Sequence, residues 1–142
     1  MRDQLHKKNI IPDKVYASPL QRVRSTAKII TDGKQQIIID ERLMERNVGE
    51  FEGRSCREFF DFEIDFLDPK LNSGAHDVEP IRDFRARADA FLQDLKISHD
   101  QDAEILVVSS NGLMKQLHML IFGVIPEETP NFQNGEVYEY EI

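Results

Sequence analysis

The stretch that decides the fold reads Val15-Tyr16-Ala17-Ser18-Pro19-Leu20-Gln21-Arg22, because a short apolar strand here runs directly into the start of a helix. Ser18 can cap that helix, Pro19 suits its first position, and Gln21 completes a capping box. Arg22 then falls in the first helical turn, where the helix macrodipole disfavours a cation by a few tenths to about 1 kcal/mol unless an anion lies beside it. The stretch therefore indicates either a bound anion at Arg22 or an ordinary surface charge.

The composition indicates a single acidic domain over residues 1–142. A hydrophobic content of 40% is enough to bury one sizeable core. The chain carries 26 acidic and 18 basic residues, a net charge of -8, which argues against binding to nucleic acid or to an anionic membrane surface. Any phosphate site must therefore be local.

The lone cysteine and the N-terminal residues bear on the compartment. Cys56 can form no internal disulfide and has no histidine or cysteine cluster around it, so neither a metal nor another cofactor is expected. Residues 1–9 are charged and polar, and no apolar run in the sequence is long enough to span a membrane. We interpret the protein as soluble and cytoplasmic.

Hydrophobic periodicity and turn residues divide the chain into alternating strands and helices. We expect strands over residues 15–17, 37–39, 105–108 and 137–142, and helices over residues 1–8, 19–31, 54–67, 80–97 and from 112 through 121, with a loop over 41–53. The run at 105–108 is continuously apolar, as in a strand buried on both faces. This order predicts an α/β fold of three layers, with a mostly parallel sheet flanked by helices.

Two strand ends carry candidate ligands for an anion. Arg22 follows the first strand, and Ser110, Asn111 and Gly112 follow the strand at 105–108. Sites of α/β folds form at the carboxyl ends of the strands, and small residues there let helix N–H groups point at a ligand. The two turns together predict a phosphate cradle, whereas the second turn alone is more typical of a plain helix cap.

The order of these motifs resembles the histidine phosphatase, or phosphoglycerate mutase-like, superfamily. Residues 15–22 look like the second arginine motif of that family, and residues 42–53 are similar to its Leu-x-Glu-x-x-x-Gly-x-x-x-Gly loop. Residues 106–112 lie where the family has a Val-Ser-His-Gly-Gly strand end, and residues 73–76 loosely resemble a Gly-Gly-Glu-Ser turn. The resemblance covers nearly the whole chain.

The resemblance implies a covalent mechanism in which a histidine attacks a phosphoryl group held by two arginines and a second histidine. By position, Arg22 is the second clamping arginine, Glu45 is the proton donor, and Ser110 takes the place of the second histidine. The implied partner is phosphate or a small phosphorylated molecule. Arg24 and Arg46 have no role in the motifs, and we interpret them as solvated charges.

The chain departs from the family at the nucleophile. The 142 residues contain no Arg-His-Gly triplet, so the resemblance implies that the first strand, the nucleophilic histidine and the first clamping arginine are missing before Met1. His6, His76, His99 and His118 offer no convincing substitute, and His76 is the best placed of the four. A missing inner strand predicts unpaired sheet edges, and with them a closed-up sheet, a homodimer or strand exchange.

Three hypotheses follow from the sequence. The first is a truncated family member that keeps the phosphate cradle without covalent phosphatase or mutase activity. The second is an active phosphomonoesterase whose N-terminal segment is absent from this chain. The third is an interaction module with an idle pocket. The residues do not name the substrate, and they do not separate mutase from phosphatase chemistry.

Overall fold

The computed structural model describes residues 2–7, 10–55 and 77–142. They fall into two compact units, one formed by Met1–Glu45 with Ala88–Ile142 and the other by Arg46–Arg87. The predicted helix at 54–67 begins with Arg54 and Ser55, which are not helical. The rest of that helix, together with Cys56 and His76, lies outside the described residues.

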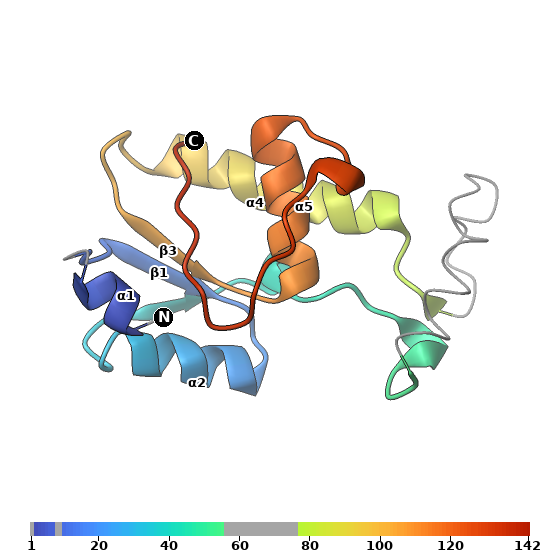
Figure 1. The fold of residues 1–142 in the computed structure, drawn as a ribbon, viewed down its shortest axis with the longest axis horizontal. Coiled ribbons are helices and arrows are strands. Elements are labelled where there is room, and N and C mark those ends of the chain that lie inside the picture. Colours follow the sequence, from blue (N-terminus) through green and yellow to red (C-terminus); the bar gives the residue numbers. More distant parts are fainter. Residues whose placement is uncertain (1, 8–9, 56–76) are drawn as a thin grey trace. The chain divides into compact units, whose positions relative to one another are not determined.

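The first unit contains a parallel sheet of three strands in the order β2-β1-β3 (Figure 1). These are β1 (Lys14–Ala17), β2 (Ile37–Ile39) and β3 (Ile105–Val108). Both neighbours run parallel to β1, with Ala17 opposite Ile39 on one side and Val108 on the other. The parallel α/β sheet expected from the sequence is confirmed.

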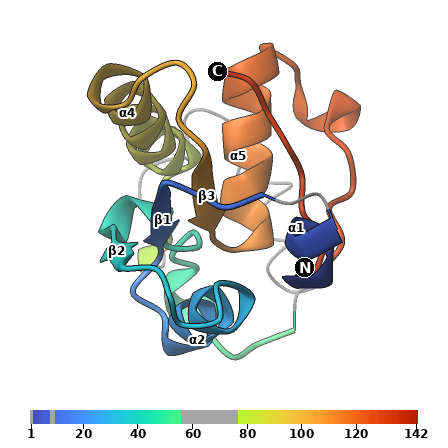
Figure 2. The same cartoon turned by 90° about the vertical axis from the view of Figure 1, so that its left-hand side faces the viewer.

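Helices cover both faces of this sheet (Figure 2). On one face, α1 (Arg2–Lys7) and α2 (Gln21–Ile30) enclose a core of buried side chains, namely Leu5, Val15, Ala17, Val23, Ala27, Ile30 and Val108. On the other face, Tyr16 packs edge-on against Phe91 of α4 (Ile81–Ser98), with ring centroids 5.5 Å apart. The alternation of side chains along β1 thus produces the expected three layers.

The remaining described elements are short or follow β3. Helix α5 (Asn111–Phe122) succeeds β3 and ends at Gly123, whose φ of 65° is the left-handed conformation that favours glycine. The predicted loop at 41–53 contains two single 3₁₀ turns, η1 (Glu41–Leu43) and η2 (Gly49–Phe51), and η4 (Pro126–Glu128) lies after α5. Of the helices described, none is long and apolar enough to cross a bilayer.

The start of α2 differs from the prediction. The helix begins at Gln21 with Leu20 as N-cap, and no side chain caps it. Ser18 is 1% exposed, and its N–H donates to Val108 O over 3.4 Å. Pro19 keeps the residue before it extended, so Ser18 continues the line of β1 and cannot cap the helix. The predicted capping box is therefore wrong.

The edge of the sheet beside β3 also differs from the prediction. Residues 105–107 are only half-buried, and only Val108 is buried, because within the described ranges β3 pairs with β1 alone. The predicted strand at 137–142 does not form. Val137 instead packs against the core and donates its N–H to Gln4 Oε1 over 3.1 Å. The Gln4 side chain of α1 thus binds this segment, and no β-ladder forms there.

Candidate functional site

The two strand-to-helix junctions singled out in the sequence lie side by side. Ala17 and Val108 are register partners at the carboxyl ends of β1 and β3, and Ser18 N–H bonds to Val108 O beyond them. Helices α2 and α5 begin shortly after these ends, at the same end of the sheet (Figure 1). The structure therefore brings the two turns of the predicted phosphate cradle, after β1 and after β3, to the carboxyl end of the sheet.

Arg22 occupies the first turn of α2, as predicted. Its side chain is exposed, and the turn contains neither an acidic residue nor a capping side chain. Among the described residues the Arg22 guanidinium has no hydrogen bond or ion pair, although its carbonyl accepts one from Thr26 Oγ1. Unsatisfied N–H groups and an unpaired guanidinium at a helix start favour an anion there.

Glu45 lies at the start of α5. The N–H of Gly112 donates to Glu45 Oε2 over 3.0 Å. A Cβ added at Gly112 would lie 2.9 Å from Glu45 Cδ and closer still to Oε1, so only glycine leaves room for this carboxylate. Two motifs far apart in the sequence therefore meet in one contact.

Ser109 fixes the chain just before Glu45, a role that the sequence did not indicate. Its Oγ donates to Leu43 O over 2.7 Å, and the Leu43 side chain is fully buried.

Asp40 begins the same turn and accepts from Arg42 Nη2 at 2.7 Å, and Arg42 also pairs with Asp94. The hydrogen bonds from Arg42 lower the pKa of Asp40, against the opposing effect of burial.

The other predicted cradle residues behave in different ways. Ser110 is the N-cap of α5, yet its hydroxyl makes no cap bond, and neither this Oγ nor that of buried Ser18 has a partner among the described residues. The side chain of Asn111 donates to Phe132 O over 2.8 Å, which ties the C-terminal segment to α5. Two buried hydroxyls at this edge thus keep unmet hydrogen-bonding capacity, while the Asn111 amide is committed elsewhere.

Arg46 belongs to the second unit and is not a solvated charge. It is 9% exposed, and its Nε donates to Glu79 O over 2.8 Å. Glu79 also pairs with Arg87 at 2.7 Å and accepts from Asn47 N–H. The interpretation of Arg46 as solvated is wrong, because this network compensates its burial, whereas Arg24 is exposed as expected.

Each described histidine has a partner away from the cradle. His6 lies 3.3 Å from Asp32, His99 Nε2 lies 3.2 Å from Tyr16 OH, and His118 Nδ1 lies 3.4 Å from Tyr140 OH. Within the described ranges, no cluster of histidine, cysteine or acidic side chains is suited to a metal ion.

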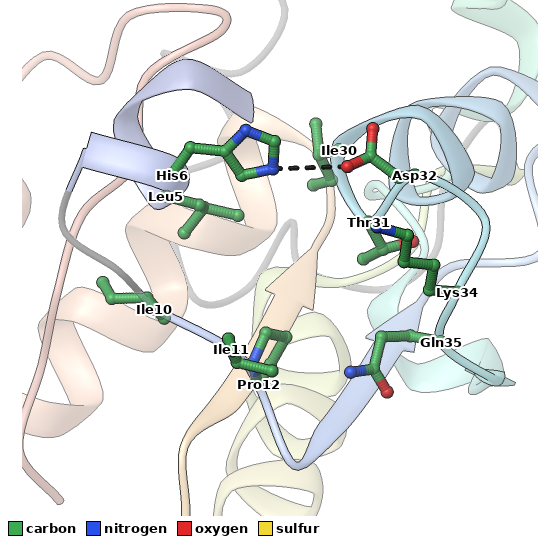
Figure 3. A pocket seen from close by; sticks show the side chains of 10 residues that line it. All are labelled: Leu5, His6, Ile10, Ile11, Pro12, Ile30, Thr31, Asp32, Lys34 and Gln35. Carbon is green, nitrogen blue, oxygen red and sulfur yellow. Dashed lines mark ion pairs between the residues drawn. The ribbon is translucent and has the colours of Figure 1, made fainter.

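The cavity beside His6 lies at the opposite end of the sheet, where the strands have their amino ends. It measures about 380 Å³ and is lined by residues that precede β1 and by residues at or after the last turn of α2, among them Ile11, Pro12 and Lys34 (Figure 3). His6 and Asp32 face each other across its rim in the same view. Because β1 begins beyond Pro12, this hollow faces the amino ends of the strands, where α/β folds do not place their sites.

Comparison with known proteins identifies the family. A family model of the histidine phosphatase superfamily (branch 1) matches residues 3–142. The chain belongs to the histidine phosphatase superfamily. A curated relative from Hydrogenobacter thermophilus, named "Putative phosphoserine phosphatase 2", is 34% identical over 117 residues, covering 79% of this chain and 57% of that protein.

Solved structures of other proteins share the fold of this chain. The alpha-ribazole phosphatase from Shigella flexneri is 25% identical, with a TM-score of 0.65 over 89% of this chain and 65% of that chain. A phosphoglycerate mutase from Bacillus anthracis is 21% identical, with a TM-score of 0.65 over 82% of this chain and 62% of that one. The chain thus spans between 57% and 65% of the length of these three relatives.

Proposed function

We propose that this chain binds the phosphoryl group of a small phosphorylated molecule at the adjoining ends of β1 and β3. The observation that carries the proposal is the 3.0 Å hydrogen bond between Gly112 N–H and Glu45 Oε2. It joins the two segments that resemble the family's proton-donor loop and its second-histidine turn. The neighbouring first turn of α2 adds the guanidinium of Arg22.

Electrostatics favours a small ligand over a large polyanion. The net charge of -8 repels polyanions at long range, so binding relies on short contacts. Arg22 supplies a charged donor, and the first N–H groups of α2, with those of α5 other than Gly112, supply neutral ones. Ser110 and Ser18 contribute hydroxyls that are buried and lack partners among the described residues. A tetrahedral oxyanion matches this set of donors.

We propose further that these 142 residues alone do not carry out covalent phosphoryl transfer. They contain no Arg-His-Gly triplet, and the three described histidines pair with other groups. Loss of the nucleophile from a catalytic unit typically costs several orders of magnitude in rate. Glu45 would then line the pocket without a covalent step to assist.

Calorimetric titration with inorganic phosphate and with vanadate tests the binding proposal. The wild-type chain should bind both anions weakly, and Arg22→Ala should reduce the affinity by about tenfold, as expected for one charged hydrogen-bond donor. Arg24→Ala is the matched control, because Arg24 is an exposed arginine of the same helix. No binding by the wild-type chain, or equal losses in the two variants, contradicts the proposal.

A second candidate is an active phosphomonoesterase completed by a further segment that contains the nucleophile. The 34% identity to a relative named as a phosphoserine phosphatase favours it, as does the coverage of only 57% of that relative. An in-frame Arg-His-Gly in the DNA upstream of Met1, with p-nitrophenyl phosphate hydrolysis by the extended protein, would establish this candidate. Its absence leaves phosphate binding as the function of the chain.

A third candidate, an interaction module, rests on the half-buried edge of β3. Under this candidate, a homodimer forms along that edge and the chain binds none of the phosphate compounds tested.

We also propose that residues 1–142 form one domain in the cytoplasm, which agrees with the family match over 3–142 and with the single cysteine.

A further inference from the structure

We propose that Glu45 makes this site selective for an oxyanion that carries a proton, and that Gly112 and Ser109 are the positioning residues that hold Glu45 in place. The inference rests on the proposed function, since it concerns the same site. It predicts that hydrogen phosphate or a protonated phosphate ester binds, and that sulfate of the same size and shape is rejected.

The contact with Gly112 places the carboxylate beside the donors of the site. Glu45 Oε2 accepts the Gly112 N–H at 3.0 Å. This N–H belongs to the first turn of α5, and the neighbouring N–H groups of that turn are the ones expected to hold the anion. Any oxyanion bound at this turn therefore lies against a glutamate side chain.

The absence of a side chain at Gly112 is what permits this arrangement. A Cβ there would lie 2.9 Å from both Glu45 Cδ and Oε2, well inside van der Waals contact. Gly112 lies within a helix and needs no left-handed backbone conformation, so its sequence position is explained by space for Glu45. Glycine is a weaker helix former than alanine, so room for Glu45 is the structural reason for a glycine at this position.

Ser109 fixes the backbone that leads to Glu45. Its hydroxyl donates to Leu43 O over 2.7 Å, two residues before Glu45. Leu43 is fully buried, so the carbonyl and the side chain fix the chain at the same point. Ser109 and Gly112 flank the junction between β3 and α5 and together set the position of the carboxylate.

A carboxylate next to a bound oxyanion discriminates by protonation. An ionised carboxylate only accepts hydrogen bonds. Hydrogen phosphate can donate its proton to Glu45 while its other oxygens accept from Arg22 and the helix N–H groups. Sulfate has no proton to donate near neutral pH, so it meets the Glu45 carboxylate as a like charge without a hydrogen bond between them. The hydroxyls of Ser18 and Ser110 accept or donate and do not discriminate.

The test is calorimetric titration of the wild-type chain with inorganic phosphate and with sulfate at equal ionic strength and about pH 6, where phosphate esters near their second pKa retain a proton. We expect phosphate to bind at least about tenfold more tightly than sulfate, the value of one charge-assisted hydrogen bond. Glu45→Gln should bring the two affinities together by admitting sulfate. Glu41→Gln removes an exposed charge from the same loop and is the matched control.

The positioning residues are tested by the same affinity ratio. Ser109→Ala should lower the ratio of phosphate to sulfate affinity, and Ser109→Thr, which keeps the hydroxyl, should restore it. Equal affinities in the wild-type chain, or a ratio unchanged by Glu45→Gln, overturn this inference and leave the proposed function standing. Failure of both anions to bind overturns the proposed function and this inference with it.

Discussion

Gly112 and Glu45 are joined by a 3.0 Å hydrogen bond, and Gly112 lacks a side chain at the place where the Glu45 carboxylate lies. The contact connects the loop after β2 with the first turn of α5. It also puts a negative group at a helix start, where the macrodipole stabilises it. The predictions about stability follow from this contact and from the network that precedes Glu45.

Gly112→Ala should destabilise the protein. Alanine is the better helix former by up to about 1 kcal/mol, so a substitution without other consequences would stabilise α5. The new Cβ displaces Glu45, and we expect a net loss of about 1–3 kcal/mol in the free energy of unfolding, within the range of overpacked substitutions. Urea denaturation followed by circular dichroism measures the change.

Glu45→Ala provides the control for that substitution. In the Glu45→Ala background the three atoms nearest to the added Cβ are removed, so Gly112→Ala should be neutral or stabilising there. The double-mutant cycle then isolates the coupling between the two residues. A stabilising effect of Gly112→Ala in the wild-type background would show that Glu45 does not lie against Gly112.

Asp40→Asn should destabilise the protein at neutral pH and much less in acid. Hydrogen bonds from Arg42 lower the pKa of Asp40 in the folded state. A carboxyl with a lowered folded pKa stabilises the fold above its unfolded pKa, and this contribution disappears as the pH falls through the folded pKa. We expect a loss of about 1 kcal/mol at pH 7.

The pH series decides whether the charge of Asp40 is the cause. Urea unfolding of the wild type and of Asp40→Asn should converge as the pH falls below about 4 and through the lowered folded pKa of Asp40. Asp94→Asn is the comparison, because Asp94 also pairs with Arg42 but is mostly exposed. A difference between wild type and Asp40→Asn that is the same at every pH would exclude the ion pair as its origin.

Tyr140 should titrate later than a free tyrosine. Burial raises its pKa above the ordinary value of 10.0, with a smaller contribution from Tyr138. The neutral phenol therefore stabilises the fold below pH 10, and this stability is lost as the pH rises through the folded pKa. Ultraviolet titration of the phenolate should show a late component that Tyr140→Phe removes. A titration curve that Tyr140→Phe leaves unchanged above pH 10 contradicts this prediction.

The edge of β3 should be the part of the sheet most sensitive to self-association. Residues 105–107 are half-buried and pair on one side only within the described chain. If a second copy pairs there, amide exchange over 105–107 slows as the protein concentration rises, and sedimentation detects a dimer. A monomer at all concentrations, with rapid exchange at these amides, would exclude the proposed homodimer.

The sequence was sufficient to predict which segments form the parallel strands. The apolar runs at 37–39 and 105–108 form β2 and β3 with the predicted bounds, because short β-branched runs between helices have few other places to pack. The α/β pattern alone does not fix strand order, and the pairing of Ala17 with Val108 in the structure brings both junctions to the carboxyl end of the sheet.

Tertiary contacts decided the features that the sequence did not predict. Ser18 has the composition of a cap, but its hydrogen bond to Val108 keeps it in line with the sheet. Arg46 resembles a solvated charge until Glu79 is placed beside it. The strand expected at 137–142 needs a partner strand, and Gln4 offers only a side-chain acceptor. Local helix and strand propensities carry no information about these partners, which are distant in the sequence.

The central claim, that both junctions bind one oxyanion, is tested most directly by a nuclear magnetic resonance titration of backbone amides with inorganic phosphate. The account predicts that the amides of residues 20–23 and of residues 110–112 shift together along one saturation curve, and that Arg22→Ala weakens both sets of shifts alike. Shifts confined to one junction, or centred on the cavity beside His6, would contradict it.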